Sequence, residues 1–351
     1  MSIKKIAEQV GVSCSTVSRV LNNPNYRCSS EEIREKIWEA AMEHNYTPNE
    51  AARSLKLGLK NQDGNTFYIS VLMTRTDANH VDPFFSELLR VIESEIHRNI
   101  CILSKIWYEP VFSDDKRCQT LDIEKKIEEM CKDTKEKNDG LIIIGKCNIE
   151  ALKILNKKYK SVVSVNRNST NYQVDEVLCD GRKVAAMAVE YLVQLGHTQI
   201  GYVGACHNES RYRGFLDVVE KYNLKIDPAW VLETNQTEVE GFEAMKKFLG
   251  KKGAPTGIYC ANDITAIGML KCLQQYKNRY YHPSIIASDD IEEAQNTKPM
   301  LTTVGLPKEE MGKFALYLLV DRLKGGHKVI TRLELEGKLM IRNSCSNYES
   351  N

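Results

Sequence analysis

The chain has 351 residues, of which 42% are hydrophobic, so more than one domain with a sizeable core is expected. Its 48 basic and 47 acidic residues leave a net charge of +1, which excludes a protein that is basic over its whole surface but not one with a local basic patch. The sequence has no apolar run long enough to span a membrane and no apolar signal core at its N-terminus, so we expect a cytoplasmic protein without a membrane partner.

The 11 cysteines are odd in number and include no Cys-x-x-Cys pair or other paired metal spacing. Most lie among apolar neighbours, as Cys179, Cys260 and Cys272 do, which favours buried and reduced thiols. We therefore expect no disulfide framework, no metal and no cofactor.

Residues 3–21 carry the pattern of two short helices joined by a turn. Apolar residues recur on one face of the first helix, Gly11 permits the positive φ with which a helix ends, and Ser13 can cap the second helix. In a helix-turn-helix unit the start of the second helix enters the major groove of DNA, where Arg19 could pair bidentately with guanine and Cys14 could touch a base. The candidate DNA contacts of this stretch are Ser13, Cys14, Ser15, Thr16, Ser18, Arg19 and Asn22. A helical hairpin in an ordinary core is the alternative.

A third helix is predicted from the Ser-x-x-Glu capping box at 29–32 to about Asn45. Several motifs around these helices match, densely and in order, those of one known family: Lys4–Ala7, Val12–Ser13, Ser15–Asn22, Tyr46–Asn49 and Ala52–Leu55. They resemble the DNA-binding headpiece of the lactose/galactose repressor family. The resemblance implies an all-α helix-turn-helix headpiece over 1–48, with double-stranded operator DNA as its partner.

A hinge helix and linker are expected over 49–60. The helix begins at Asn49 and has about two turns, which makes it marginal alone in water. In the family it resembles, this helix orders on DNA, and the leucine that matches Leu55 wedges between base steps in the minor groove. The resemblance therefore implies DNA contacts by Asn49, Ala52 and Leu55. For Leu55, a linker residue packed on the core is the alternative.

Beyond residue 66, strands alternate with helices, which predicts parallel sheets with helices on both faces. The predicted strands are 67–73, 100–103, 140–145 and 161–165, followed by 200–203, 257–260, 284–287 and 332–336. Because the pattern restarts after Asp180, we expect an α/β core of two doubly wound lobes. The resemblance extends over this core and implies a two-lobed, periplasmic-binding-protein-like fold over 61–351. The expected N-lobe is 66–165 with 290–325, and the expected C-lobe is 166–289 with 326–345.

The cleft between the lobes is the expected effector site, because ligands of open α/β sheets bind outside the carboxyl ends of the strands. In the family, residues that match Arg211, Asn262 and Asp289 contact the effector. A guanidinium, an amide and a carboxylate suit vicinal hydroxyls, which favours a sugar or a sugar phosphate. The expected effector residues are Asp82, Phe84, Phe85, Asn166, Arg211, Gln236, Asn262 and Asp289. The alternatives are a salt bridge between Arg211 and Asp289, and core positions for the two phenylalanines.

One position departs from the family pattern. Some relatives place an aromatic side chain five residues before the glycine that matches Gly241, and Gln236 stands there in this chain. A flat stacking effector such as a purine is therefore disfavoured.

The resemblance implies a homodimer on a pseudo-palindromic operator, in which an effector changes the angle between the lobes. Most such regulators repress and are induced, and corepression is the alternative. With a sugar or sugar phosphate as the expected effector, we expect a repressor of carbohydrate-utilisation genes. The short tail after 344 has no heptad, which favours a dimer over a tetramer. An enzyme is one alternative, but the sequence lacks Gly-x-Gly-x-x-Gly, Gly-x-x-x-x-Gly-Lys-Ser/Thr, His-Glu-x-x-His and Gly-x-Ser-x-Gly. A transport-type sugar-binding protein is another, and it fits the core but not the headpiece.

Overall fold

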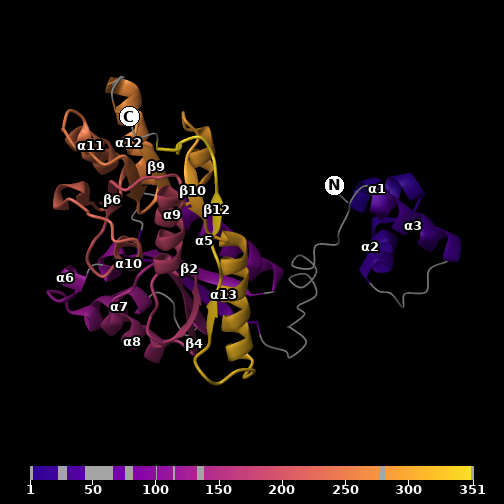
Figure 1. Ribbon diagram of the computed structural model, residues 1–351. Helices are drawn as coiled ribbons and strands as arrows, with labels where there is room; N and C mark the ends of the chain where they lie inside the picture. The colour runs from indigo at the N-terminus through magenta and orange to yellow at the C-terminus, as the bar shows by residue number, and fades with distance from the viewer. Residues whose placement is uncertain are drawn as a thin grey trace. The chain divides into compact units, whose positions relative to one another are not determined.

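The computed structural model describes residues 3–22, 30–43, 66–75, 82–99, 101–113, 115–132, 138–276 and 281–348. The chain divides into two compact units, Met1–Thr66 and Phe67–Asn351 (Figure 1). Within the described ranges, no helix is both long enough and apolar enough to cross a membrane.

The first unit packs three helices, α1 (Ile3–Val10), α2 (Cys14–Asn22) and α3 (Glu31–Glu43), around a small apolar cluster. Ile6, Val17 and Ile37 supply one fully buried side chain from each helix. Gly11 has a φ of +74°, and the Ser13 hydroxyl accepts a hydrogen bond from the Thr16 amide at 3.1 Å. The predicted turn and cap between α1 and α2 are therefore confirmed.

The second unit contains two six-stranded sheets. The first sheet consists of β1 (Tyr68–Met73), β2 (Ile102–Tyr108), β3 (Gly140–Ile144), β4 (Ser161–Asn166), β5 (Asp175–Leu178) and β11 (Arg332–Glu334). The second consists of β6 (Ile200–Gly204), β7 (Val231–Glu233), β8 (Gly257–Cys260), β9 (Ser284–Asp289), β10 (Thr302–Gly305) and β12 (Lys338–Met340). Their orders are β11-β5-β4-β3-β1-β2 and β12-β10-β9-β8-β6-β7. All pairings are parallel except that of β12 with β10, which confirms two doubly wound lobes.

Helices cover both sheets (Figure 1). The helices of the first lobe are α5 (Pro83–Arg98), α6 (Asp115–Cys118), α7 (Ile123–Cys131), α8 (Ile149–Lys158) and α13 (Lys308–Leu323), with the 3-10 turn η1 (Pro110–Ser113). Those of the second are α9 (Gly181–Gln194), α10 (Ser210–Lys221), α11 (Glu238–Phe248) and α12 (Asp263–Tyr276), with η3 (Pro228–Trp230) and η4 (Glu292–Asn296). Alternate residues of β3 pack on opposite faces: Ile142 and Ile144 lie in the cluster of α5 and α13, whereas Leu141 and Ile143 lie in that of α7 and α8.

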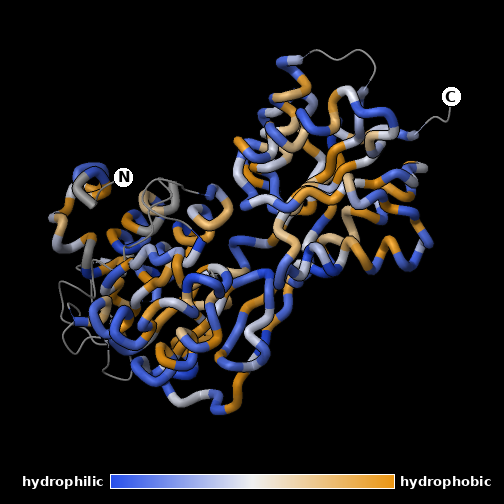
Figure 2. The backbone as a smooth tube through the Cα atoms, turned by 90° about the vertical axis from the view of Figure 1, so that its left-hand side faces the viewer, coloured by the Kyte–Doolittle hydropathy of each residue, from blue (hydrophilic) through white to orange (hydrophobic). Residues whose placement is uncertain are grey.

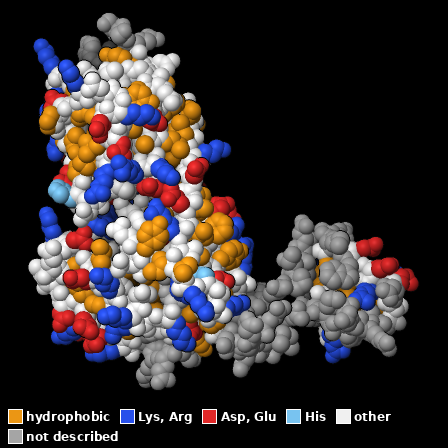
Figure 3. Space-filling view, turned by 60° about the horizontal axis from the view of Figure 1, so that its bottom comes forward, with side chains coloured by type: hydrophobic (Ala, Val, Ile, Leu, Met, Phe, Trp, Pro, Cys, Tyr) orange, Lys and Arg blue, Asp and Glu red, His pale blue; other side chains and the backbone are white. Residues whose placement is uncertain are grey.

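The strands of both sheets form the apolar centre of each lobe. Because parallel sheets are covered on both faces, their strands read as continuous apolar runs, and β3 and β4 are buried along their whole length. Figure 2 shows these hydrophobic stretches running through the interior of the two lobes. Figure 3 shows basic and acidic side chains interspersed on the face it presents, as the net charge of +1 leads one to expect.

The lobe boundaries differ from the predicted ones at three short strands. β5 continues the first sheet beyond residue 165, and β11 pairs with β5, so 332–334 belongs to the first lobe. β10 pairs with β9, so 302–305 belongs to the second lobe. β5 and β10 have only four residues each, and β5 reads Asp-Glu-Val-Leu, so apolar periodicity does not mark them. β11 lies within the predicted strand 332–336, but the prediction placed that strand in the other lobe. The chain consequently crosses between the lobes after β5, between β10 and α13, and between β11 and β12.

Two glycines bring α11 and α12 into backbone contact, which generates a test of the packing. A Cβ on Gly268 would lie 2.0 Å from the Glu238 carbonyl oxygen, and one on Gly241 would lie 2.1 Å from that of Thr265. Gly268→Ala should force the helices apart and lower the free energy of unfolding by about 1–3 kcal/mol, although alanine is the better helix former. Urea denaturation followed by circular dichroism measures this change. Lys247→Ala, on the exposed side of α11, is the control, and equal effects of the two substitutions would contradict the close packing.

Candidate functional site

The first candidate site is the exposed face of α2. Its opposite face holds Val17, Val20 and Leu21 in the core of the three-helix unit. The residues on the exposed side are small and polar apart from Arg19, and the Ser13 hydroxyl lies 2.7 Å from that of Ser15. Such a face permits close approach of a helix to base edges.

The predicted DNA contacts are described only in part. Ser13, Cys14, Ser15 and Arg19 are exposed and Thr16 is partly exposed. Ser18 and Asn22 belong to α2, but their side chains lie outside the described part of the chain, as do Asn49, Ala52 and Leu55 entirely.

The second candidate site lies where the carboxyl ends of the two sheets meet. Arg167 follows β4 of the first sheet, Asp289 ends β9 of the second, and their side chains form an ion pair across the cleft with exposures of 4% and 2%. Beside it, the Ser210 amide at the start of α10 donates to the Asn168 side chain at 3.0 Å. The two lobes are thus joined by buried polar contacts at the position where the effector was expected.

The Arg167 guanidinium also lies against two aromatic rings, those of Phe84 and Phe85. Asp82 caps α5 by accepting from the Phe84 amide at 3.0 Å, which places Phe84 and Phe85 at the start of the helix. The Arg167 guanidinium carbon lies 4.7 Å from the Phe84 ring centre and 5.2 Å from that of Phe85. Both rings are buried, so they are core residues that also present a wall to a cation.

A second buried cluster surrounds Arg211. Its Nε and Nη2 donate to the two Glu209 carboxylate oxygens at 2.8 and 2.9 Å, and Nη2 also donates to Gln236 Oε1 at 2.9 Å. The Asn262 side-chain amide donates to the Gln236 carbonyl oxygen at 3.1 Å. Arg211, Gln236 and Asn262 therefore come together as predicted, but the alternative of a salt bridge between Arg211 and Asp289 is wrong, because each has a different partner.

The pKa values of the buried carboxyl groups depend on burial and on the charges beside them. Burial alone would raise the pKa of Glu209, but the Arg211 guanidinium outweighs it and holds that pKa at about 2. Burial raises the pKa of Asp289, and the Arg167 charge opposes the rise. Asp263, which accepts from Thr303 Oγ1 at 2.6 Å, has its pKa raised to about 7 by burial and by the Asp289 charge.

Three charged residues of the cleft were absent from the predicted set. Arg167 follows Asn166 directly, Glu209 precedes Arg211 by two positions, and Arg75 comes two residues after the end of β1. Each lies just beyond a strand or at a helix start, which is the positional signal that could have found them. Asn166 itself donates to the Asn168 carbonyl oxygen at 3.2 Å.

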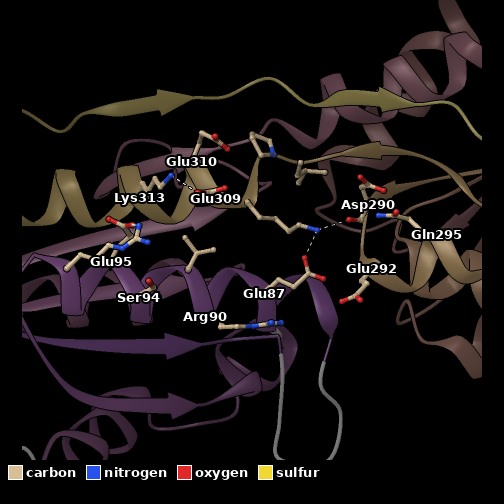
Figure 4. Close-up of a pocket in the computed structure, with 15 residues that line it drawn as sticks. Glu87, Arg90, Ser94, Glu95, Asp290, Glu292, Gln295, Glu309, Glu310 and Lys313 are labelled. Atoms are coloured by element: carbon tan, nitrogen blue, oxygen red, sulfur yellow. Dashed lines mark hydrogen bonds and ion pairs between the residues drawn. The ribbon is translucent and has the colours of Figure 1, made fainter. Parts of the chain in front are cut away.

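Two cavities lie on the core, and neither is lined by Arg167, Asp289, Arg211, Gln236 or Asn262. One, of about 460 Å³, is lined by Asn166 at the end of β4, by residues after β3, β4 and β5, and by Ser210 and Arg213 of α10. The other, of about 820 Å³, lies among α5, the start of α13 and the segment that follows β9 (Figure 4). There Lys308 Nζ lies 2.7 Å from both a Glu87 carboxylate oxygen and the Asp290 carbonyl oxygen, which adds a second link between the lobes. No cluster of residues suited to a metal ion occurs in the described part of the chain.

Two family models match the chain. Residues 2–49 match the bacterial regulatory proteins of the lacI family, and residues 189–345 match the periplasmic binding protein-like domain. Among curated relatives, the HTH-type transcriptional repressor PurR of Haemophilus influenzae is 28% identical over 359 residues and covers 98% of both chains. The PurR repressor of Escherichia coli O139:H28 is 26% identical over 355 residues, covering 98% of this chain and 97% of its own.

Solved structures share the fold at low identity. The transcriptional regulator CelR in complex with cellobiose covers 98% of this chain and 100% of its own, with a TM-score of 0.67 and 20% identity. The lac repressor dimer bound to operator and the anti-inducer ONPF covers 98% of both chains, with a TM-score of 0.63 and 21% identity. A LacI family regulator from Enterococcus faecium with bound ribose covers 80% of this chain and 100% of its own, with a TM-score of 0.65 and 24% identity.

The relatives are transcriptional regulators and not enzymes. The three-helix unit with its exposed α2 face and the two-lobed core are the two parts that such a repressor combines, one for DNA and one for a small ligand. The chain thus matches the lacI-family model over its headpiece and the periplasmic binding protein-like model over part of its core, and over 98% of its length it is similar to HTH-type transcriptional repressors.

Proposed function

We propose that this protein represses carbohydrate-utilisation genes and that a sugar or sugar phosphate, bound between the lobes, controls its affinity for the operator. The single observation that carries the proposal is a buried polar group in which Gln236 accepts hydrogen bonds from both Arg211 and Asn262. Such a group can exchange its internal hydrogen bonds for those of ligand hydroxyls. Solved structures of the same fold with cellobiose and with ribose support this class of effector.

A purine is the competing effector class. Flat ligands need an aromatic partner to stack on, and at the position where some relatives supply one this chain has Gln236. Gln236 is buried and bonded to Arg211, so it offers a polar amide and no ring face. The local chemistry therefore favours a hydroxylated ligand over a stacking one.

The proposed mechanism couples the cleft to the headpiece through the lobes. Two headpieces of a homodimer place α2 in successive major-groove faces of the operator, and the hinge residues Asn49, Ala52 and Leu55 contact the minor groove. A ligand changes operator affinity only if it binds the two lobe arrangements with different affinity. Light scattering on the purified protein tests the assembly: we expect a dimer, and a dominant tetramer or monomer would contradict this.

The main test asks whether DNA binding belongs to the first unit and effector binding to the second. Full-length protein should select one pseudo-palindromic sequence from a random DNA library, whereas a chain that begins at Thr66 should select none and still bind the effector. The reason is that α2 belongs to the first unit and the cleft to the second. Equal DNA selection by the shortened chain, or turnover of a sugar by the full-length protein, would contradict the proposed function.

Arg19→Ala tests whether the exposed face of α2 contacts base edges. If Arg19 pairs with a base edge, its loss should weaken operator binding by about 1–3 kcal/mol and relax the preference at one base pair only. Quantitative gel-shift titration against the selected operator and its single-base variants measures both effects. Lys5→Ala, exposed on α1, is a control for the loss of one positive charge. An equal loss on operator and random DNA would mean that Arg19 touches only phosphate.

A further inference from the structure

The cavity of about 460 Å³ has walls from both lobes and is separate from the Gln236 group. Of the predicted effector residues, only Asn166 lines it. The first lobe supplies residues that follow β3 and β4, and the second supplies residues at the starts of α9 and α10. Those that matter here are Lys146, Ile149 and Asn168 of the first lobe and Arg182, Asn208 and Arg213 of the second. The volume lies within the range of small-molecule sites.

Close packing fixes the helices that form the wall from the second lobe. A Cβ on Gly214 would lie 2.1 Å from the Arg182 carbonyl oxygen, so α10 lies directly against the start of α9. A Cβ on Gly181 would lie 2.3 Å from the Ser210 hydroxyl oxygen. The Ser210 amide in turn donates to Asn168 Oδ1 of the first lobe at 3.0 Å. The polar groups of both walls are therefore held in place by the fold itself.

Four polar groups of these walls have no partner within the described residues. Two are donors: the Asn168 side-chain nitrogen and the exposed Arg213 guanidinium. Two are acceptors: the second carboxylate oxygen of Asp180, whose first oxygen caps α9, and the side-chain oxygen of Asn208, whose nitrogen lies 3.5 Å from Asp115. A hydroxyl both donates and accepts, so a compound with several hydroxyls can use all four groups.

The charges around the cavity favour a neutral ligand. Three of its cations are ion-paired within the chain: Lys146 with Asp115, Arg182 with Asp217, and Arg332 with Glu334. Among the charged lining residues this leaves one of each sign, Arg213 and Asp180. The wall also has an apolar part, where Ile149 is 47% exposed and can pack against the C–H face of a sugar ring.

We infer that this cavity is a second small-molecule site, which binds a neutral, polyhydroxylated compound such as a sugar or a sugar alcohol to both lobes at once. Asn168 of the first lobe and Arg213 of the second donate to its hydroxyls, and Asp180 and Asn208 accept from them. The inference goes beyond the proposed function because the site does not include the Gln236 group. A compound held by both lobes stabilises the lobe arrangement in which the cavity is formed.

The test uses the full-length protein and named probes at constant ionic strength. Ribose, glucose, cellobiose and sorbitol are the neutral probes, and inorganic phosphate is the anionic one. Thermal-shift and calorimetric titrations measure the binding of each. We expect at least one neutral probe to raise the unfolding midpoint, because a compound that binds only the folded state stabilises it.

One substitution in each lobe then locates the bound probe. Arg213→Ala should weaken its binding by about 10- to 100-fold, and Arg213→Lys should retain part of the affinity. Asn168→Asp keeps the acceptor for the Ser210 amide and removes the free donor, so it should also weaken binding, by about tenfold. Because the Arg213 guanidinium is exposed and unpartnered within the described residues, Arg213→Ala should leave the unfolding midpoint without a probe unchanged. Lys153→Ala, which removes an exposed charge on α8, is the control and should bind like the unaltered protein.

The outcomes separate this inference from the proposed function. If Gln236→Ala weakens the binding of every probe while Arg213→Ala and Asn168→Asp weaken none, the probes bind in the effector cleft and the inference is overturned, whereas the proposed function stands. The inference is also overturned if no neutral probe binds, or if phosphate alone shows binding that depends on Arg213. If the same samples show no preference for any DNA sequence, it is the proposed function that fails.

Discussion

The ion pair between Arg167 and Asp289 is the constraint on which the core depends. It joins residues from different sheets, 122 positions apart in the chain, and both side chains are almost completely withdrawn from water. Removing either partner would leave a buried charge uncompensated, which typically costs about 3–5 kcal/mol. The stacking of Arg167 on Phe84 and Phe85 fixes the guanidinium from the other side. Polar contacts therefore link the lobes, beside an apolar cluster that contains residues of both.

A cleft held together in this way suits a regulator better than a passive binding protein. Because the lobes are connected by three crossovers and by exchangeable polar contacts, a ligand that competes for Arg167, Arg211 or Gln236 can favour a different lobe arrangement. Lys308 contacts Glu87 of the first lobe and the Asp290 carbonyl oxygen of the second, so a change in the lobe arrangement would also alter this contact. In thermodynamic terms the ligand acts only through its differential affinity for the two lobe arrangements.

Much of the fold was predictable because its signals are local. The cap at Ser13 and the turn at Gly11 define α2, and the continuous apolar runs define β3 and β4. The strands that were misassigned are short, and β5 contains Asp175, which is buried only because Arg322 and His327 reach it from the end of α13 and beyond. The ion-pair partners in the cleft were unpredictable because they are far apart in the sequence. No residue near Asp289 indicates that Arg167 is its partner. From strand positions alone Asp289 could also have paired with Arg211, but Glu209 does so.

The most direct test of the account is a double-mutant cycle across the cleft, measured as operator affinity without any added effector. The four proteins are the unaltered chain, Arg167→Gln, Asp289→Asn and the double variant, each checked for folding by circular dichroism. If the ion pair sets the lobe arrangement that the headpieces sense, either single substitution should change the operator dissociation constant, and the double variant should differ little from the singles because both remove the same contact. Operator affinities that stay equal in all four folded proteins, or effects that simply add, would contradict it.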